Sequence, residues 1–319
     1  MLHPTDKNPV VTVVCLVYNH ESYLKECLEG FVTQQTSFPF QVIVHDDYST
    51  DRSAEIIIEY AKKYPDIIIP ILEIENQYSK HDGSLKKAID PHIKGKYVAL
   101  CEGDDFWTDR NKLQTQVDFM ELHPECSLCF HPVNILREDK PVGYQDPLYS
   151  HLHEGFYDAN DIIKKWTIPT CSTLMIKEAY LTKPNNKNFV VGDNVLWLNC
   201  YKYGKAYCLP QKMGTYRRTT SGWIHRTYSG NKTSIAKSYE RYYIHLELLK
   251  KYFPGIADKQ INATQLKYLA HLCKIYLTFY DKKAIEKFKM GINMGKLQFL
   301  KELFNSILLS LKVRITRHE

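Results

Sequence analysis

The sequence predicts an α/β protein: a mostly parallel sheet flanked by helices, followed by a C-terminal helical extension. Three observations carry this prediction. Apolar, β-branched runs alternate with helix-patterned segments between Val10 and His131, with short connections, which is typical of parallel sheets. From Lys232 onward the pattern is helical. The 319 residues, 44% hydrophobic and 24% charged, are enough for roughly two globular domains.

The strands of the sheet are predicted from continuous apolar runs. Val10–Val17 is apolar and β-branched, as expected for a strand buried on both faces. Further strands are predicted at Phe40–His45, Ile67–Leu72, Tyr97–Cys101 and Ser127–His131. Intervening helices are predicted at Glu21–Thr33, Ser53–Lys63, Leu85–His92 and Asn111–His123. Sheets of this kind bind ligands beyond the carboxyl ends of their strands, where the strand order switches.

The rest of the chain divides into an irregular middle and a helical end. Glu138–Thr227 shows one strand, Thr170–Ile176, and one helix, Asp193–Tyr203. Helices are then predicted at Lys232–Phe253, Gln260–Tyr280, Lys283–Met290 and Leu297–Val313. We therefore expect an α/β domain over residues 1–227 and a helical region over residues 228–319.

The net charge of +6 is unevenly distributed. Residues 231–319 hold 17 Lys and Arg against 7 Asp and Glu, whereas residues 1–230 hold 25 against 29. This split argues against a nucleic-acid partner and favours an anionic partner for the tail alone, such as a membrane surface. Leu297–Val313 is predicted to be an amphipathic helix. Packing on its own domain and pairing in a homodimer, taken together, are favoured over contact with a membrane.

The sequence also predicts the compartment. No apolar run approaches the ~18 residues of a membrane span, and Met1–Pro9 is too polar for a signal peptide. The chain is expected to be cytoplasmic, with peripheral contact at the inner face of the cell membrane as the further option. Nine cysteines fit this compartment, and the C-x-x-C of Cys126 and Cys129 is interpreted as core packing.

Acidic clusters follow the predicted strands. Asp46-Asp47 follows the second strand, Glu102-Gly103-Asp104-Asp105 the fourth, and Asp193 opens a helix. Each cluster alone is more often a turn or a helix cap. Several at one sheet edge, with Trp107 beside one of them, favour a site. Carboxylate oxygens suit Mg²⁺ or Mn²⁺, which in turn favours a nucleotide diphosphate as the ligand.

Three segments together resemble family 2 glycosyltransferases of the GT-A, Rossmann-like fold. They are VVTVVCLVYN at Val10–Asn19, QVIVHDDYSTDR at Gln41–Arg52 and GKYVALCEGDDFW at Gly95–Trp107. Their order and separation also fit the family, and the resemblance extends from about Val10 to Trp223. The general likeness is to bacterial members that build surface polysaccharide.

The resemblance implies roles for the donor-binding residues. Val17, Tyr18 and Asn19 match the segment that lies against the nucleotide base and ribose, and Asp47 matches the carboxylate that binds the base, typically uracil. Glu102-x-Asp104 occupies the D-x-D position, so Asp104 would be the direct metal ligand. Glu102 replaces the usual Asp of this motif, so the resemblance does not decide whether Glu102 contacts the ribose or the metal. Asp105 would order the loop or hold a metal-bound water.

The resemblance also implies the catalytic base. Asp193 stands where the family keeps this base, but Gly192 replaces the acid that commonly precedes it. Arg217, together with Arg218, would steady the leaving diphosphate. Thr219 stands where many relatives have a metal-binding His, and the spacing of His225 does not make it a good substitute.

The implied activity is metal-dependent, inverting transfer of a sugar, as in a hexosyltransferase. A nucleotide-sugar donor, expected to be a UDP-sugar, would serve a saccharide or lipid-linked acceptor in surface polysaccharide synthesis. Two alternatives stay open: an inactive nucleotide-binding module of the same fold, and a nucleotidyltransferase that forms sugar nucleotides. The second is disfavoured because no glycine-rich loop follows the first strand, and a dinucleotide-binding dehydrogenase fails on the same ground.

Overall fold

The computed structural model describes residues 8–141, 144, 146–165, 168–219, 232–278 and 281–315. The chain forms two compact units. The first comprises Met1–Lys187 with Asp193–Thr220, and the second comprises Asn188–Gly192 with Ser221–Glu319. The β-sheets lie in the first unit and the long helices α9, α10 and α11 in the second.

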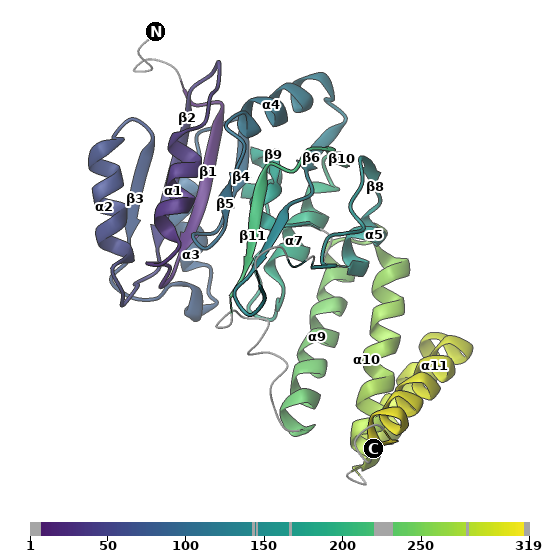
Figure 1. The fold of residues 1–319 in the computed structure, drawn as a ribbon. Helices are drawn as coiled ribbons and strands as arrows, with labels where there is room; N and C mark the ends of the chain where they lie inside the picture. The colour runs from purple at the N-terminus through teal and green to yellow at the C-terminus, as the bar shows by residue number, and fades with distance from the viewer. Residues whose placement is uncertain are drawn as a thin grey trace. The chain divides into compact units, whose positions relative to one another are not determined.

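The main sheet of the first unit runs in the order β3-β2-β1-β4-β9-β6-β10-β8 (Figure 1). Its strands are β1 Val11–Val17, β2 Phe40–Asp46, β3 Ile68–Leu72, β4 Tyr97–Leu100, β6 Cys126–Phe130, β8 Gly155–Tyr157, β9 Leu174–Ile176 and β10 Lys205–Cys208. β1 pairs in parallel with both β2 and β4, so the strand order switches between β1 and β4. β9 is antiparallel to both of its neighbours. The predicted mostly parallel sheet is confirmed.

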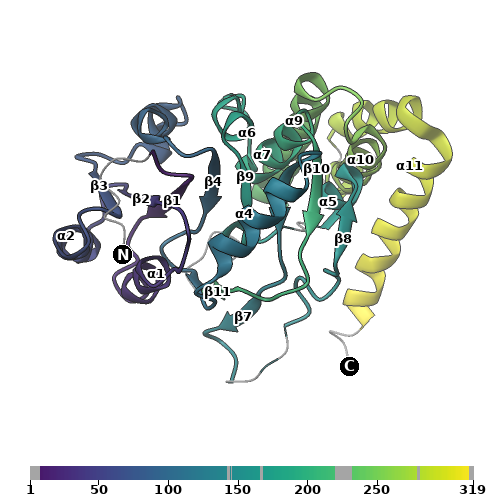
Figure 2. The same ribbon diagram turned by 90° about the horizontal axis from the view of Figure 1, so that it is seen from above.

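Helices cover both faces of this sheet (Figure 2). One face packs on α1 Leu24–Val32, α2 Ser53–Lys63 and α4 Lys112–Leu122. The other packs on α3 Ser84–Ile89, α5 Ala159–Lys165, α6 Lys177–Leu181 and α7 Gly192–Cys200. Successive side chains of a strand point to opposite faces, and Val13 of β1 accordingly joins the first core while Val14 joins the second. This explains the unbroken apolar pattern of β1.

A smaller sheet lies beside the acidic loop. It has the order β5-β11-β7 and comprises β5 Phe106–Trp107, β7 Asn134–Arg137 and β11 Gly214–Arg218. The sequence did not predict these short strands. The strand predicted at Thr170–Ile176 is correct only for Leu174–Ile176, because Thr170–Ser172 forms a 3₁₀ turn in which the Ser172 hydroxyl donates to Pro169 O at 2.7 Å.

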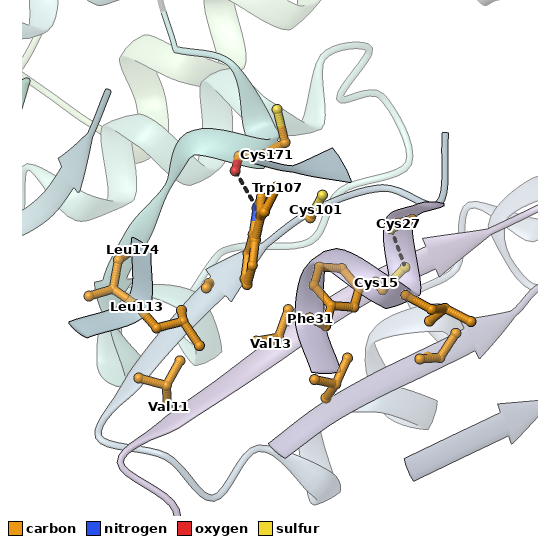
Figure 3. Close-up of a cluster of buried hydrophobic side chains, with 14 of the residues drawn as sticks. Val11, Val13, Cys15, Cys27, Phe31, Cys101, Trp107, Leu113, Cys171 and Leu174 are labelled. Atoms are coloured by element: carbon orange, nitrogen blue, oxygen red, sulfur yellow. Dashed lines mark hydrogen bonds between the residues drawn. The ribbon is translucent and has the colours of Figure 1, made fainter. Parts of the chain in front are cut away.

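Trp107 anchors β5 in the first core (Figure 3). Its indole N–H donates to Cys171 O at 2.8 Å, and its ring meets Phe31 edge-on with centroids 4.7 Å apart. The buried Lys112 ammonium lies 4.1 Å from the centre of the same ring. Because Trp107 follows the acidic loop by two residues, this packing fixes one end of the loop. All nine cysteines are free and buried, so the C-x-x-C is part of the core as predicted.

The second unit is helical. Its helices are α9 Lys232–Tyr252, α10 Asp258–Thr278 and α11 Lys283–Ile315. Non-helical dihedrals at Gly295 interrupt α11, and the resulting bend is visible in Figure 2. The two helices predicted from the sequence are the two halves of α11. Among the described residues, no helix is both long and apolar enough to cross a membrane.

The bend in α11 brings Gly291 against the buried Phe299 ring. A Cβ on residue 291 would lie 2.3 Å from Phe299 Cδ2 and Cε2. We expect Gly291→Ala to lower the free energy of unfolding by about 1–2 kcal/mol, since overpacking outweighs the gain in helix propensity. Urea unfolding would measure this. Asn293→Ala, at an exposed position of the same helix, is the control, and a Gly291→Ala protein as stable as the parent would contradict the packing.

Candidate active site

The loops that follow β1 and β2 are bound to each other by hydrogen bonds from backbone N–H groups to side-chain oxygens. Asn19 N donates to Ser49 Oγ at 2.9 Å, and Thr50 N donates to Asn19 Oδ1 at 2.8 Å. Glu21 N donates to Asp51 Oδ2 at 2.9 Å. Asn19 has φ +58°, a conformation that Asn tolerates better than most residues. The predicted nucleotide-contacting segment is therefore held rigidly, with the Tyr18 ring exposed.

Asp47 organises a third loop at the same sheet edge. Its Oδ1 accepts from Gln77 N at 2.6 Å and its Oδ2 from Tyr78 N at 3.1 Å. Each carboxylate oxygen keeps a further lone pair that a ligand could use. The loop after β3 carries no recognisable sequence pattern, so Tyr78 could not be predicted to lie here.

Tyr78 links the Asp47 loop to the carboxylates of the site. Surrounding protein atoms, and then the nearby Asp193 and Glu102, raise the pKa of the Tyr78 hydroxyl. Its ring is nevertheless largely exposed. An aromatic face accessible at this point could stack on a base or a sugar.

The acidic loop follows β4 and lies against the end of β1. Gly103 N donates to Leu16 O at 2.9 Å. A Cβ on residue 103 would lie 2.8 Å from His20 Nδ1 and 3.0 Å from Val17 Cγ2, so glycine permits this close approach. The Val17 side chain is buried beneath the loop. Val17 therefore supports the loop, whereas Tyr18 and Asn19 reach the surface.

Two of the predicted site carboxylates, Asp104 and Asp193, lie near enough to Glu102 for their charges to act on it. Glu102 is accessible to solvent but surrounded by protein atoms, and this desolvation, followed by the charges of Asp104 and Asp193, raises its pKa to about 8. Burial also raises the pKa of Asp193, which the nearby Lys183 ammonium partly offsets. Within the described part of the chain, no hydrogen bond is made to these three carboxylates. The three carboxylates are therefore available to a ligand. Lys183, whose ammonium lies near Asp193, could not be identified from the sequence.

The oxygen atoms of these carboxylates are suitable ligands for a hard divalent cation such as Mg²⁺ or Mn²⁺. The carboxylate oxygens repel one another, and an ion between them would remove that repulsion. Among the described residues, no group of three or more His, Cys, Asp or Glu is placed to hold a metal by itself. One or two carboxylates, with Asp104 foremost, would thus share the ion with oxygens of a bound phosphate or water, which is the usual arrangement for Mg²⁺.

Asp105 and Arg217 hold the acidic loop in place. The Arg217 backbone N–H donates to Asp105 Oδ1 at 2.7 Å, and Arg217 Nε donates to Asp104 O at 2.8 Å. The same guanidinium donates to Glu26 Oε2 at 2.7 Å and lies 4.7 Å from the centre of the Tyr23 ring. Asp105 is buried, so it orders the loop, and its role toward a metal-bound water stays a prediction.

The predicted contact of Arg217 with a diphosphate also stays a prediction, because its guanidinium already has protein acceptors. Its neighbour Arg218 donates to the buried carboxylate of Asp146 at 2.8 Å. Thr219 lies just beyond β11, and His225 and Trp223 fall outside the described residues.

Arg217→Lys should loosen the acidic loop, because a lysine lacks the forked geometry that reaches Asp104 O and Glu26 together. We expect metal affinity to fall roughly tenfold and catalytic efficiency about 10- to 100-fold. UDP titrations with and without Mn²⁺ distinguish two roles of Arg217. If Arg217 only holds the acidic loop in place, UDP binding weakens in the presence of Mn²⁺ alone. Equal weakening in both titrations would instead mean that Arg217 contacts the diphosphate. Arg218→Lys, which keeps a cation beside Asp146, is the control.

Proteins of similar sequence include uncharacterized proteins and glycosyltransferases. Uncharacterized protein Rv1520 of Mycobacterium tuberculosis is 35% identical over 230 residues, covering 70% of this chain and 62% of that protein. This chain thus spans less than two thirds of that relative's length. The teichuronic acid biosynthesis glycosyltransferase TuaG of Bacillus subtilis is 28% identical over 253 residues, covering 78% of this chain and 92% of TuaG.

Solved structures share the fold. The S. aureus TarS 1–349 complex with UDP-GlcNAc has a TM-score of 0.57 at 15% identity, covering 93% of this chain and 79% of that chain. The mannosyltransferase PcManGT of Pyrobaculum calidifontis, in complex with GDP-Man and Mn²⁺, has a TM-score of 0.56 at 14% identity, covering 95% and 88%. These likenesses confirm the predicted GT-A fold. Residues 12–180 match the glycosyl transferase family 2, and the chain therefore belongs to that family.

Proposed function

We propose that this protein transfers a sugar from a nucleoside-diphosphate donor to an acceptor hydroxyl, with inversion at the anomeric carbon, assisted by Mg²⁺ or Mn²⁺. The observation that carries the proposal is that Glu102 and Asp104 directly follow β4, beside the switch in strand order, and that the charges of Asp104 and Asp193 both act on Glu102. Ligands of open α/β sheets bind at such a point. The family supports the reaction class.

Each carboxylate has a distinct task. Asp104, with Glu102, would hold the divalent ion, which when bound offsets the negative charge that develops on the leaving diphosphate. Asp193 would take the proton of the acceptor hydroxyl, which is a poor nucleophile until deprotonated. Asp47, Tyr18 and Asn19 would hold the base and ribose. A single base and direct displacement need no nucleophilic carboxylate, which is why inversion is expected.

The donor is proposed to be a UDP-sugar and the acceptor a saccharide or lipid-linked saccharide of a surface polysaccharide. TarS with UDP-GlcNAc supports the uridine nucleotide, and TuaG, named for teichuronic acid biosynthesis, supports the polymer class. PcManGT binds GDP-Man instead, so the experiment must compare guanine with uracil nucleotides.

Thermal unfolding against a panel of UDP- and GDP-sugars, with and without Mn²⁺, tests the donor. We expect a UDP-sugar to raise the midpoint only when Mn²⁺ is present, because the ion bridges carboxylate and diphosphate. Slow release of UDP from that donor would then demonstrate an active centre. Binding without any donor hydrolysis or transfer would instead support the inactive nucleotide-binding module.

A further inference from the structure

The second half of α11 has two different apolar sides. One side packs within the second unit: Phe299 is buried with Leu266 and Leu269 of α10. Ser306 is also buried on this side, with its hydroxyl 2.9 Å from His271 Nδ1 of α10. The sequence showed a single amphipathic stripe, but only these positions and the partly buried Leu303 use it for packing.

The other side leaves its apolar residues exposed. Leu297 is 85% exposed and Phe304 is 62% exposed. Three more apolar side chains are exposed along the same helix: Leu300, Ile307 and Leu308. At 3.6 residues per turn, these five positions fill an arc roughly 100° wide, on the side of the helix away from Phe299 and Ser306. Packing within the described part of the second unit therefore leaves Leu297 and Phe304 mostly open to solvent, and Leu300 and Leu308 partly so.

Exposed lysines border this arc on both sides. Lys296 lies about 20° beyond one edge and Lys301 about 20° beyond the other. Of the exposed described positions from 296 to 308, none carries a carboxylate. The chain around the helix is also basic, with 17 Lys and Arg against 7 Asp and Glu over residues 231–319.

From this arrangement we propose that α11 lies on an anionic lipid surface, with the arc of Leu297, Leu300, Phe304, Ile307 and Leu308 in the interface. Lysine side chains at the edges of such an arc can bury their methylene stems while their ammonium groups meet the headgroups. Charge selects this occupant. If a second copy packed against the chain through this same face, lysine-bordered faces would meet, and the exposed described positions from 296 to 308 offer no carboxylate to pair them. Phosphate headgroups complement both edges.

Sedimentation of the full chain with lipid vesicles tests this inference without any need for sugar transfer. Vesicles of equal parts phosphatidylcholine and phosphatidylglycerol should carry the protein into the pellet at low salt. Pure phosphatidylcholine should bind it far less, and high salt should release it. Lys296→Glu with Lys301→Glu should weaken binding about 30-fold or more, because each lysine near the surface contributes roughly a fivefold factor. Phe304→Glu should weaken binding at least about tenfold.

Matched controls separate this face from general surface effects. Leu122→Glu changes an exposed leucine at the end of α4, and Lys62→Glu with Lys63→Glu reverses two exposed lysines of α2. Both should bind like the parent. The inference is overturned if the parent stays in the supernatant, or if these controls lose as much binding as the α11 variants. Equilibrium sedimentation without lipid tests whether the face is instead a dimer interface. That result requires a parent dimer that Phe304→Glu dissociates, together with no binding of the parent to vesicles.

Discussion

Asp104→Asn is expected to abolish metal-dependent donor binding and to reduce sugar transfer at least about 10³-fold. The amide keeps the size of the side chain but removes the negative charge that a divalent ion requires. The loop should survive the change, because its hydrogen bonds use Asp104 O and the Asp105 carboxylate, and neither is altered. Titration of UDP in the presence of Mn²⁺ measures the binding, and a radiolabelled-donor assay measures transfer.

Asp66→Asn provides the matched control for this substitution. Asp66 is exposed and precedes β3, at the opposite end of the strand from the acidic loop, so its neutralisation should change neither measurement. A thermal unfolding midpoint equal to that of the parent would establish that Asp104→Asn folds normally. If this variant then bound UDP in Mn²⁺ as tightly as the parent, Asp104 would not be the metal ligand.

The sheet could be predicted because its strands are buried on both faces. Such strands are rich in apolar and β-branched residues, and β1, β2 and β4 were placed to within a residue at each end. The strands β5 and β11 could not be recognised this way. They are short, and β11 begins with Gly214 and ends in Arg217 and Arg218, so its two strand-favouring residues, Thr215 and Tyr216, are too few to predict a strand. Pairing with β5 and β7, which lie far away in the chain, stabilises it.

The site was predictable where it depends on strand ends. Glu102 and Asp104 directly follow β4, as the strand pattern indicated, and Asp193 in the first turn of α7 lies near enough to Glu102 to act on its pKa. Contacts between distant loops were beyond reach. Arg217 N and Asp105 Oδ1 are separated by 112 positions in the chain, and no local pattern marks that pairing. The same holds for Tyr78, which enters the site only because Asp47 binds its backbone.

Asp193→Asn should reduce turnover about 10²- to 10⁴-fold while leaving donor affinity unchanged, because a general base acts on the acceptor. The substitution also removes a negative charge near Glu102. Since that charge helps to raise the pKa of Glu102, its loss lowers this pKa and favours the ionised, metal-binding form. The lost charge also attracted the divalent ion, so the two effects oppose each other. Metal affinity should therefore fall far less than in Asp104→Asn, which separates the two variants.

Asn194→Ala is the control for the Asp193 substitution, because it alters the adjacent position of α7 without removing a charge. Its turnover should stay close to that of the parent. Near-normal turnover of Asp193→Asn would exclude Asp193 as the base, and Asp158 and Asp161 would be substituted next. Those two are weaker candidates: Asp158 Oδ1 already accepts from Asn160 N at 2.8 Å, and Asp161 lies in the first turn of α5. Burial raises the pKa of Asp193, which makes its carboxylate a stronger base than an exposed one.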